Sequence, residues 1–375
     1  MTQGIAERLK SEVTDPIKER FVGRDEVIDL IALAAVAGEH LFLLGPPGTA
    51  KSALIREFAL AVRGRYFEYM LTRFSEPNEI FGPIDIVRLR EGVVATVVAG
   101  MLPEAEFVFL DELFNANSAI LNNLLTVLNE RIYRRGLETH RLPLLSLYSA
   151  SNHLPEDQAL QALFDRFLVR CHVRSLEREA LPRLLAAGWA LESHTTSESS
   201  VSAEEIRSLS SHLYRVDLSA VMEPYMDALL KIRDLGIGFT DRRAVKVQKL
   251  LAASATLCGR TQATAADLWV LRYVWDREEQ IEPLAALING ILELHPNETQ
   301  RHALSLPPAH VDGEQIARQL NAVEKELNDG AKSLSALARL KEQVTHLADQ
   351  AAWISDQKHR DFLLTRARQF LERLG

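Results

Sequence analysis

The spacing of apolar residues changes at two points along the chain and divides it into three parts. Between about residues 38 and 173, short runs of consecutive apolar residues alternate with segments of helical periodicity. Consecutive rather than alternating apolar positions are typical of strands buried on both faces. The expected strands are Leu41–Leu44, Tyr66–Tyr69, Phe107–Leu110, Leu144–Ser149 and Phe167–Val173. The pattern predicts an α/β domain over residues 1–176, whose parallel sheet carries helices on both faces.

The second part, residues 177–277, shows helical periodicity without strand runs. A stretch rich in Ser, Thr and Glu at Ser193–Ser202 and the glycines Gly236 and Gly238 interrupt this periodicity. We therefore expect a separate, small all-α domain.

The third part, residues 278–375, is also predicted to be helical. Three prolines and several polar residues over Pro296–Gly313 indicate a loop or linker after its first helix. Amphipathic segments over Ile316–Ile354 and a last helix around Phe362–Leu371 follow. These segments are too short to require a sustained coiled coil, so a small helical bundle is the favoured interpretation.

The segment after the first strand has the composition and spacing of a phosphate-binding loop. It reads Gly45-Pro46-Pro47-Gly48-Thr49-Ala50-Lys51-Ser52. The glycines let backbone N–H groups turn toward phosphates, and the following helix adds the positive end of its dipole. We expect Lys51 to reach the terminal phosphates and Ser52 to bind Mg²⁺; a Gly/Pro turn with an incidental lysine is the alternative. Ala50 replaces the last glycine of the general pattern, and we expect it to adopt ordinary helical dihedral angles.

A second buried strand ends in two acidic residues, as a nucleotide site requires. The segment Phe107–Leu110 is followed by Asp111 and Glu112. We expect Asp111 to lie on the metal side and Glu112 to act as the base that polarises the attacking water. An acidic residue after a strand is more often a helix cap, but the upstream pair Lys51-Ser52 favours the catalytic interpretation.

Three further polar residues complete the predicted site. Asn152 follows the strand Leu144–Ser149 and could orient the water beside Glu112, or simply form a turn. Thr240-Asp241-Arg242-Arg243 is typical of a helix start, and we expect Arg242 to touch the γ-phosphate from above. Arg166 precedes the last strand and is the candidate arginine finger toward a neighbouring subunit. A local ion pair with Asp165 is the alternative for Arg166.

In order and spacing these elements resemble the Walker A, Walker B, sensor 1, arginine finger and sensor 2 elements of an AAA+ ATPase. The run Leu102–Glu112, together with Ile120–Asn122 and Leu128–Arg131, is similar to the MoxR family and most of all to its RavA branch. The resemblance extends from about Val22 to Trp275. It implies a P-loop NTPase fold with an all-α lid, Mg²⁺ as cofactor and ATP as substrate. It also implies that Val22 and Gly23 lie near the adenine.

Two predicted hairpins support the same resemblance. Ile84–Leu89 and Val93–Val98 flank Arg90-Glu91-Gly92, and Ile132–Leu137 forms a second hairpin before the sensor 1 strand. In MoxR-like proteins the corresponding elements are the helix 2 insert and the pre-sensor 1 hairpin, which face the pore of a ring. Simple edge hairpins are the alternative.

The resemblance further implies a von Willebrand factor A domain partner and, for the RavA branch, a C-terminal helical domain with a β-rich insertion. Pro296–Gly313 is too short for that insertion. The carry-over of a RavA-type association with lysine decarboxylase is therefore not expected.

Composition and charge limit the partners and the cellular location that we expect for the protein. The 375 residues carry a formal net charge of −8, which disfavours a nucleic-acid partner because such binding needs a clustered basic surface. The chain has no apolar stretch long enough for a membrane span, and Glu7 interrupts the start where a secretory signal needs its apolar centre. Only Cys171 and Cys258 are present, without metal-ligand spacing. We expect a cytoplasmic protein without an integral membrane segment.

Together these features predict an Mg²⁺-dependent ATPase that forms a hexameric homo-oligomer and remodels, activates or assists metal insertion into a protein client. A DNA-acting motor is the first alternative, since Arg88, Arg90, Arg134 and Arg135 lie on the predicted hairpins. An adaptor that binds nucleotide without significant turnover is the second alternative, although the combination of Lys51, Asp111 and Glu112 counts against it.

Overall fold

A computed structural model of the chain describes residues 2–135, 138–176, 178–191, 199–295 and 300–306. Beyond these it describes residues 317, 320, 321, 323, 324, 340, 341, 344, 345, 347, 348, 351 and 357–374. The chain divides into two compact units, Met1–Ser305 and Leu306–Gly375, and each is described by itself.

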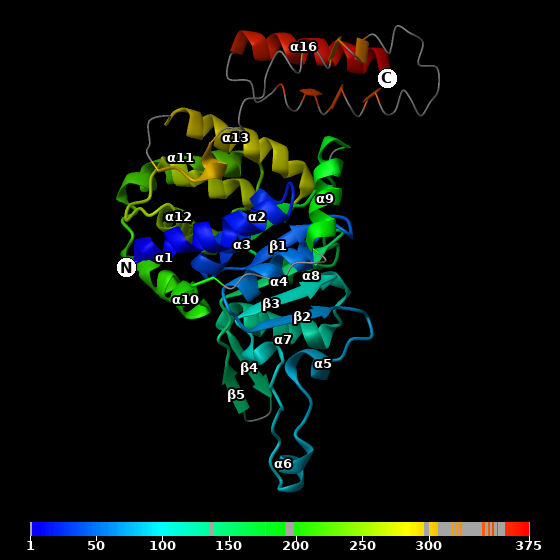
Figure 1. Cartoon of the computed structure of the whole chain (residues 1–375), viewed down its shortest axis with the longest axis vertical. Helices are drawn as coiled ribbons and strands as arrows, with labels where there is room; N and C mark the ends of the chain where they lie inside the picture. The colour runs from blue at the N-terminus through cyan, green and yellow to red at the C-terminus, as the bar shows by residue number, and fades with distance from the viewer. Residues whose placement is uncertain are drawn as a thin grey trace. The chain divides into compact units, whose positions relative to one another are not determined.

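A five-stranded parallel sheet forms the centre of the first unit (Figure 1). The strands are β1 (Leu41–Leu44), β2 (Tyr66–Met70), β3 (Phe107–Asp111), β6 (Ser146–Ser151) and β7 (Val169–His172). Their order across the sheet is β2-β3-β6-β1-β7, so β6 lies between β3 and β1. All residues of β1 and β6 are buried, as expected for strands covered on both faces. The predicted α/β sheet is confirmed, although β6 begins and ends two residues later than expected.

Helices alternate with the strands of the sheet along the chain, as the pattern predicts. They are α3 (Asp25–Ala37), α4 (Lys51–Ala61), α7 (Ser118–Glu130) and α8 (Gln158–Phe164), with short helices η3 (Leu113–Asn115) and η2 (Leu102–Glu104) between them. The helix α7 begins where the side chain of Asn117 accepts hydrogen bonds from the N–H groups of Ala119 and Ile120. Its buried face, Ile120, Leu121, Leu124, Val127 and Leu128, joins the main core.

The first predicted hairpin is wrong in its central part. Ile86–Arg90 forms a short helix, α6, at the far end of a long excursion that also contains α5 (Pro77–Phe81) (Figure 1). The side chain of Asp85 caps α6 by accepting from the N–H groups of Val87 and Arg88, and Gly92 follows the helix at φ 80°. Only the base is strand-like, where Ile84 and Thr96 form an antiparallel bridge. The physical reason is local, because an Asp cap completes a helical turn that the apolar spacing alone does not reveal.

The second hairpin is confirmed. It consists of β4 (Ile132–Arg135) and β5 (Glu138–Arg141), which pair antiparallel from Ile132 opposite Arg141 to Arg135 opposite Glu138. Gly136 and Leu137 at its turn lie outside the described residues. The two excursions touch each other, because the Tyr133 ring stacks on Phe81 with centroids 4.8 Å apart.

A layer of helices completes the first unit and confirms the helical lid. It contains α9 (Leu181–Leu191), α10 (Ala203–His212), η5 (Leu213–Arg215), α11 (Ser219–Asp234), α12 (Asp241–Leu257), η6 (Ala265–Tyr273), η7 (Glu278–Gln280), α13 (Ile281–Glu293) and η8 (Ala303–Ser305). The N-terminal segments α1 (Thr2–Arg8), η1 (Leu9–Thr14) and α2 (Asp15–Arg20) precede α3, and α1 packs on α10 and α12 (Figure 1). Since α13 packs on α11 and η6, it belongs to the first unit.

The second unit has a core of its own. Its buried residues are Leu320, Val323, Leu340, Val344, Leu347, Ala351, Leu363, Ala367 and Phe370. The last three lie on the helix α16 (Gln357–Leu374), and Arg366 on this helix pairs with Glu324 at 2.6 Å. Other residues of the predicted amphipathic segments, including Leu327, Leu334 and Ile354, lie outside the described residues. The division into three domains at 176 and 277 stays a prediction.

Candidate nucleotide site

The strand order brings most of the predicted nucleotide residues to one edge of the sheet. The phosphate loop follows β1, Asp111 ends β3, and Asn152 directly follows β6. Because the three strands are parallel and β6 lies between the other two, these groups share the carboxyl edge of the sheet. Ligands of open parallel sheets bind at this edge, so the predicted loop and acidic residues form one candidate site.

The phosphate loop is held against the sheet by close backbone contacts. The N–H of Gly45 donates to Ser151 O at 3.0 Å. A Cβ atom at Gly45 would stand 2.3 Å from the carbonyl oxygen of Val173, so only glycine fits here. Ala50 has φ 63° and ψ 22°, in the left-handed region, so the expectation of ordinary helical angles is wrong. The chain keeps a methyl group where the general pattern has glycine, at a cost of about 1 kcal/mol.

Lys51 lies at the first position of α4, and its ammonium group points into the loop. Its Nζ donates to Gly45 O at 2.9 Å, to Pro46 O at 2.8 Å and to Thr49 Oγ1 at 3.4 Å. Burial lowers the pKa of Lys51, while the negative charges of Asp111 and Glu112 act in the opposite direction. The cation is thus pre-positioned between the loop and the two acidic side chains.

The two acidic residues at the end of β3 adopt different conformations. Asp111 Oδ1 accepts from the N–H of Glu112 at 3.0 Å, and its backbone oxygen accepts from Leu71. Glu112 has φ 52° in the left-handed region, which turns the chain sharply out of the strand. Bulky residues occupy this region rarely, and such strain is found preferentially at functional sites.

The oxygen groups at this edge suit a magnesium ion. The Ser52 hydroxyl and the Asp111 carboxylate are hard oxygen donors, and Mg²⁺ in such sites takes one or two protein oxygens together with phosphates and waters. Within the described part of the chain, no hydrogen bond occupies the Ser52 hydroxyl. Ser52 and Asp111 would hold the ion, which would neutralise charge on the phosphates. Among the described residues no group of three His, Cys, Asp or Glu side chains forms a complete metal site.

Asn152 follows β6 as predicted and is exposed. Within the described residues its side chain makes no hydrogen bond. Its position between the phosphate loop and Glu112 is compatible with orienting a water molecule. The role of Asn152 stays a prediction.

The segment Val22–Gly23 lies beside the same edge, near the chain that leaves β7. Gly23 has φ 67°, and a Cβ atom there would stand 2.5 Å from Leu176 Cδ2. Arg24, which the motif analysis missed, donates from Nη1 to Arg174 O at 2.9 Å, and its charge lowers the pKa of Lys51 after the larger effect of burial. Arg24 therefore adds a second cationic side chain, besides Lys51, at this edge. Its place directly after Val22–Gly23 was the available sequence signal.

The two predicted catalytic arginines lie elsewhere. Arg166 comes before the start of β7, and Arg242 donates from Nη2 to Asn129 Oδ1 at 2.6 Å. Asn129 is near the end of α7, two residues before Arg131, whose guanidinium group donates to the carbonyls of Gly38 and Leu144. Those carbonyls precede β1 and β6, so this is the amino edge of the sheet.

The structure therefore does not bring Arg242 over the phosphate loop of its own chain. Instead, Arg242 lies near Arg166. Burial, followed by the positive charge of Arg242, lowers the pKa of Arg166, so the two guanidinium groups are close enough to repel each other. The predicted alternative for Arg166 is also present, as Nη1 pairs with Asp165 Oδ2 at 3.2 Å. The Nε atom of Arg166 is buried, and it has no hydrogen-bond partner among the residues that the structure describes. The arginine pair and the phosphate loop thus lie at opposite edges of the sheet.

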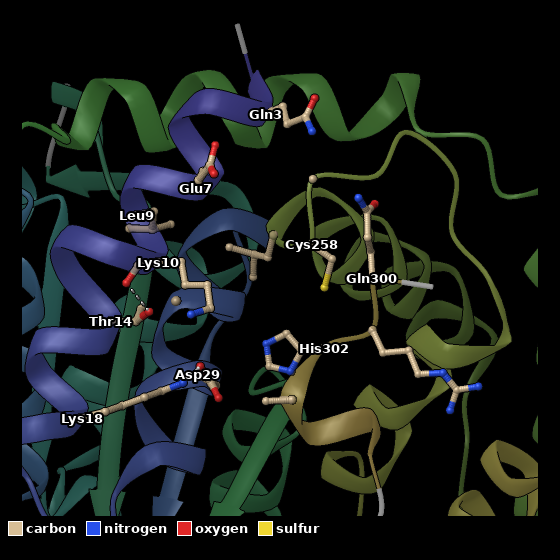
Figure 2. Close-up of a pocket in the computed structure, with 15 residues that line it drawn as sticks. Gln3, Glu7, Leu9, Lys10, Thr14, Lys18, Asp29, Cys258, Gln300 and His302 are labelled. Atoms are coloured by element: carbon tan, nitrogen blue, oxygen red, sulfur yellow. Dashed lines mark hydrogen bonds and ion pairs between the residues drawn. The ribbon is translucent and has the colours of Figure 1, made fainter. Parts of the chain in front are cut away.

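A separate cavity of about 370 Å³ lies between the N-terminal helices, the end of α12 and residues 300–303 (Figure 2). The ion pair of Lys18 and Asp29, with a distance of 2.5 Å, lies on one side of it. His302 lies on another and stacks on Trp269 with ring centroids 4.4 Å apart. The cavity shares no residue with the phosphate loop, so it is distinct from the candidate nucleotide site.

Comparison with known proteins gives the chain a family. Residues 7–211 match the description "MoxR domain in the MoxR-vWA-beta-propeller ternary systems", and residues 226–288 match the AAA lid domain. Two Methanocaldococcus jannaschii proteins of unassigned function are similar. One is 37% identical over 72% of both chains, and the other is 33% identical over 94% of this chain and 92% of its own length.

Two further similarities concern better described proteins. Chaperone MoxR1 of Mycobacterium tuberculosis is 28% identical over 45% of this chain and 47% of its own. A solved structure from Cytophaga hutchinsonii, described as a candidate ATPase, superposes with a TM-score of 0.63 at 19% identity, over 78% of this chain and 95% of that one. At this identity the superposition shows the fold alone. With the matched family description covering more than half of its residues, the chain belongs to the MoxR family of AAA+ ATPases.

Proposed function

We propose that the protein is an Mg²⁺-dependent ATP hydrolase whose active sites form between neighbouring subunits of a ring. The observation that carries this proposal is the separation of the two halves of the site. Lys51, Asp111 and Glu112 lie at the carboxyl edge of the sheet, and Arg166 and Arg242 lie together at the amino edge. A complete site then needs the arginines of a second copy.

Each residue has a defined task in this reaction. Lys51 and the loop N–H groups bind the phosphates of ATP, and Ser52 and Asp111 would hold Mg²⁺. Glu112 accepts a proton from water as the water oxygen bonds to the γ-phosphorus. The bond from that phosphorus to the bridging oxygen breaks, and ADP leaves with the electron pair. Arg166 of the neighbour stabilises the charge that develops on the transferred group, and Asn152 orients the water.

We further propose a closed hexamer, because contacts between two different faces of a subunit generate rings when the rotation closes. The tip of the excursion around α6 exposes apolar side chains: Ile86 by 65%, Val87 by 69% and Val93 by 49%. Exposed apolar groups of this kind favour a protein client over DNA. A von Willebrand factor A domain partner is supported by the description of the matched family. The output is then remodelling or activation of a client.

Glu112→Gln tests the catalytic assignment. The amide cannot accept a proton from water, so turnover should fall by roughly a hundredfold or more while ATP binding remains. Glu156→Gln, at an exposed position of the loop after β6, is the matched control and should keep normal turnover. Wild-type hydrolysis by Glu112→Gln would show that Glu112 is not the base. Loss of ATP binding would show that it acts in binding instead.

None of the described helices is long and apolar enough to cross a membrane. The cytoplasmic location and the RavA branch stay predictions.

A further inference from the structure

Arg170 is a buried arginine in the middle of β7, with 1% of its side chain exposed. Its guanidinium group donates from Nε to Phe167 O at 3.0 Å and from Nη2 to Phe164 O at 3.1 Å. These two carbonyls stand on either side of Arg166. The guanidinium also lies over the ring of Phe164, 3.9 Å from its centroid. Arg170 therefore holds both ends of the short segment that carries the candidate arginine finger.

The same guanidinium group reaches the helical lid. Its Nη1 donates to Asp276 Oδ1 at 2.5 Å and to the carbonyl oxygen of Trp275. Asp276 Oδ1 also accepts from Arg243 Nη1 at 2.8 Å. Arg243 is 3% exposed and directly follows Arg242 in α12. One carboxylate oxygen thus joins the helix that carries Arg242 to the strand that holds the Arg166 segment.

The charges of Arg170 and Arg243 make their shared contact with Asp276 dependent on the negative charge of that carboxylate. Two buried guanidinium groups share one carboxylate, and burial, followed by the charge of Arg243, lowers the pKa of Arg170 to about 10. Removing the negative charge of such a cluster leaves two like charges facing each other without compensation. Loss of the Asp276 charge should therefore displace the Arg166 segment and the start of α12.

We propose that Arg170, Asp276 and Arg243 form a positioning cluster that fixes Arg166 and Arg242 relative to each other, so that the lid and the finger approach a neighbour's ATP as one unit. The cluster touches no reacting atom and acts through the two arginines. This inference rests on the proposed function, which assigns Arg166 and Arg242 to the γ-phosphate of the next subunit.

Asp276→Asn tests the cluster in the full-length protein. The amide keeps an acceptor of similar shape but removes the charge, so Arg166 should lose its fixed position. Because a misplacement of about 1 Å can cost as much as roughly a hundredfold, we expect kcat to fall by about tenfold or more. Affinity for a fluorescent ATP analogue should stay within about twofold, since the phosphate loop lies at the other edge.

Lys246→Gln is the matched control. Lys246 also lies on α12 and joins the lid to the sheet domain through Glu39 at 2.6 Å, but it does not contact the Arg166 segment. If the cluster only attaches the lid, both variants should lower turnover alike, and that result would overturn the proposal. Asp276→Glu, which keeps the charge, should recover part of the lost kcat and serves as the readout if Asp276→Asn fails to fold. Faster turnover by a folded Asp276→Glu than by a folded Asp276→Asn supports the charge requirement, and equal turnover by the two variants would contradict it.

A double variant separates this inference from the proposed function. If Asp276 acts through Arg166 and Arg242, then adding Asp276→Asn to the double variant Arg166→Ala, Arg242→Ala should not lower its residual turnover further. Multiplicative losses would contradict the positioning role. Wild-type turnover by Arg166→Ala would instead refute the proposed function, whatever the Asp276 variants do.

Discussion

At the residue scale, Ala50 and Glu112 at the candidate site have left-handed backbone angles, with φ 63° and φ 52°. The types and spacing of Lys51, Ser52, Asp111 and Glu112 follow from the chemistry of phosphate and metal binding. The left-handed angles of Ala50 and Glu112 depend on how the chain leaves the sheet edge, which no local pattern encodes. Arg24 was missed for a similar reason, because its carbonyl partner Arg174 lies 150 residues away.

Ala50→Gly should stabilise the protein. Ala50 has φ 63°, where the Cβ atom of an L-residue is strained and glycine is not. The free energy of unfolding should therefore rise by about 1 kcal/mol in Ala50→Gly. Chemical denaturation measures this change. Ala53→Gly, in the helical part of α4, is the control and should lower stability by about 0.5–1 kcal/mol. Equal destabilisation by both variants would show that Ala50 is not strained.

At the element scale, buried strands and helices were predicted well and exposed excursions less well. Continuous apolar runs mark strands because burial on both faces demands them, and all five strands formed. Residues 86–94 have no buried face to fix their periodicity, since all of them are exposed, including Ile86, Val87 and Val93. There the local hydrogen bonds of Asp85 decide in favour of a helix at the tip.

Asp85→Ala should open α6 without affecting the core. Its side chain accepts from Val87 N at 2.9 Å and from Arg88 N at 3.1 Å, and loss of such a cap costs about 1 kcal/mol. Amide hydrogen exchange should speed up in residues 86–90 only. Asp157→Ala removes the equivalent cap of α8, where Asp157 accepts from Ala159 N at 2.7 Å, and should speed exchange there instead. Unchanged exchange in residues 86–90 would mean that Asp85 does not hold the helix.

At the scale of the whole molecule, the position of the lid could not be predicted. The pattern gave a helical domain after the sheet, but the contacts that place α12 join residues more than 100 positions apart. Lys246 and Lys249 pair with Glu39 before β1, and Arg242 bonds Asn129. The charge and periodicity of the sequence indicate which of these side chains are exposed, but not which residues they contact. For this reason the sequence predicted that Arg242 touches the γ-phosphate but gave no sign of its bond to Asn129 or of its nearness to Arg166.

The folded protein should lose stability as the pH falls below neutrality, because two histidines are buried in neutral form. Burial and nearby cations lower the pKa of both His40 and His302 from 6.5 to about 3. Leu147 N donates to His40 Nδ1 at 3.0 Å, so that nitrogen must stay unprotonated. The unfolded chain binds protons that the folded chain excludes. The stabilisation is therefore complete above pH 6.5 and declines toward pH 3.

Urea unfolding at pH 7 and pH 5.5 measures this effect, which should be about 1 kcal/mol for each histidine. His40→Asn keeps an acceptor for Leu147 and should remove roughly half of the pH dependence. His153→Asn, at an exposed position, should leave it unchanged. If the free energy of unfolding changes with pH equally in wild type and His40→Asn, His40 does not contribute to the pH dependence.

The central claim is that one subunit supplies the phosphate loop and the next supplies Arg166. The most direct measurement is ATP hydrolysis by a mixture of Lys51→Ala and Arg166→Ala subunits, each inactive alone. In a randomly mixed ring, roughly a quarter of the boundaries join an intact loop to an intact finger, so the equimolar mixture should recover up to about a quarter of wild-type activity. A mixture no more active than its separate components, in rings shown to exchange subunits, would contradict the account.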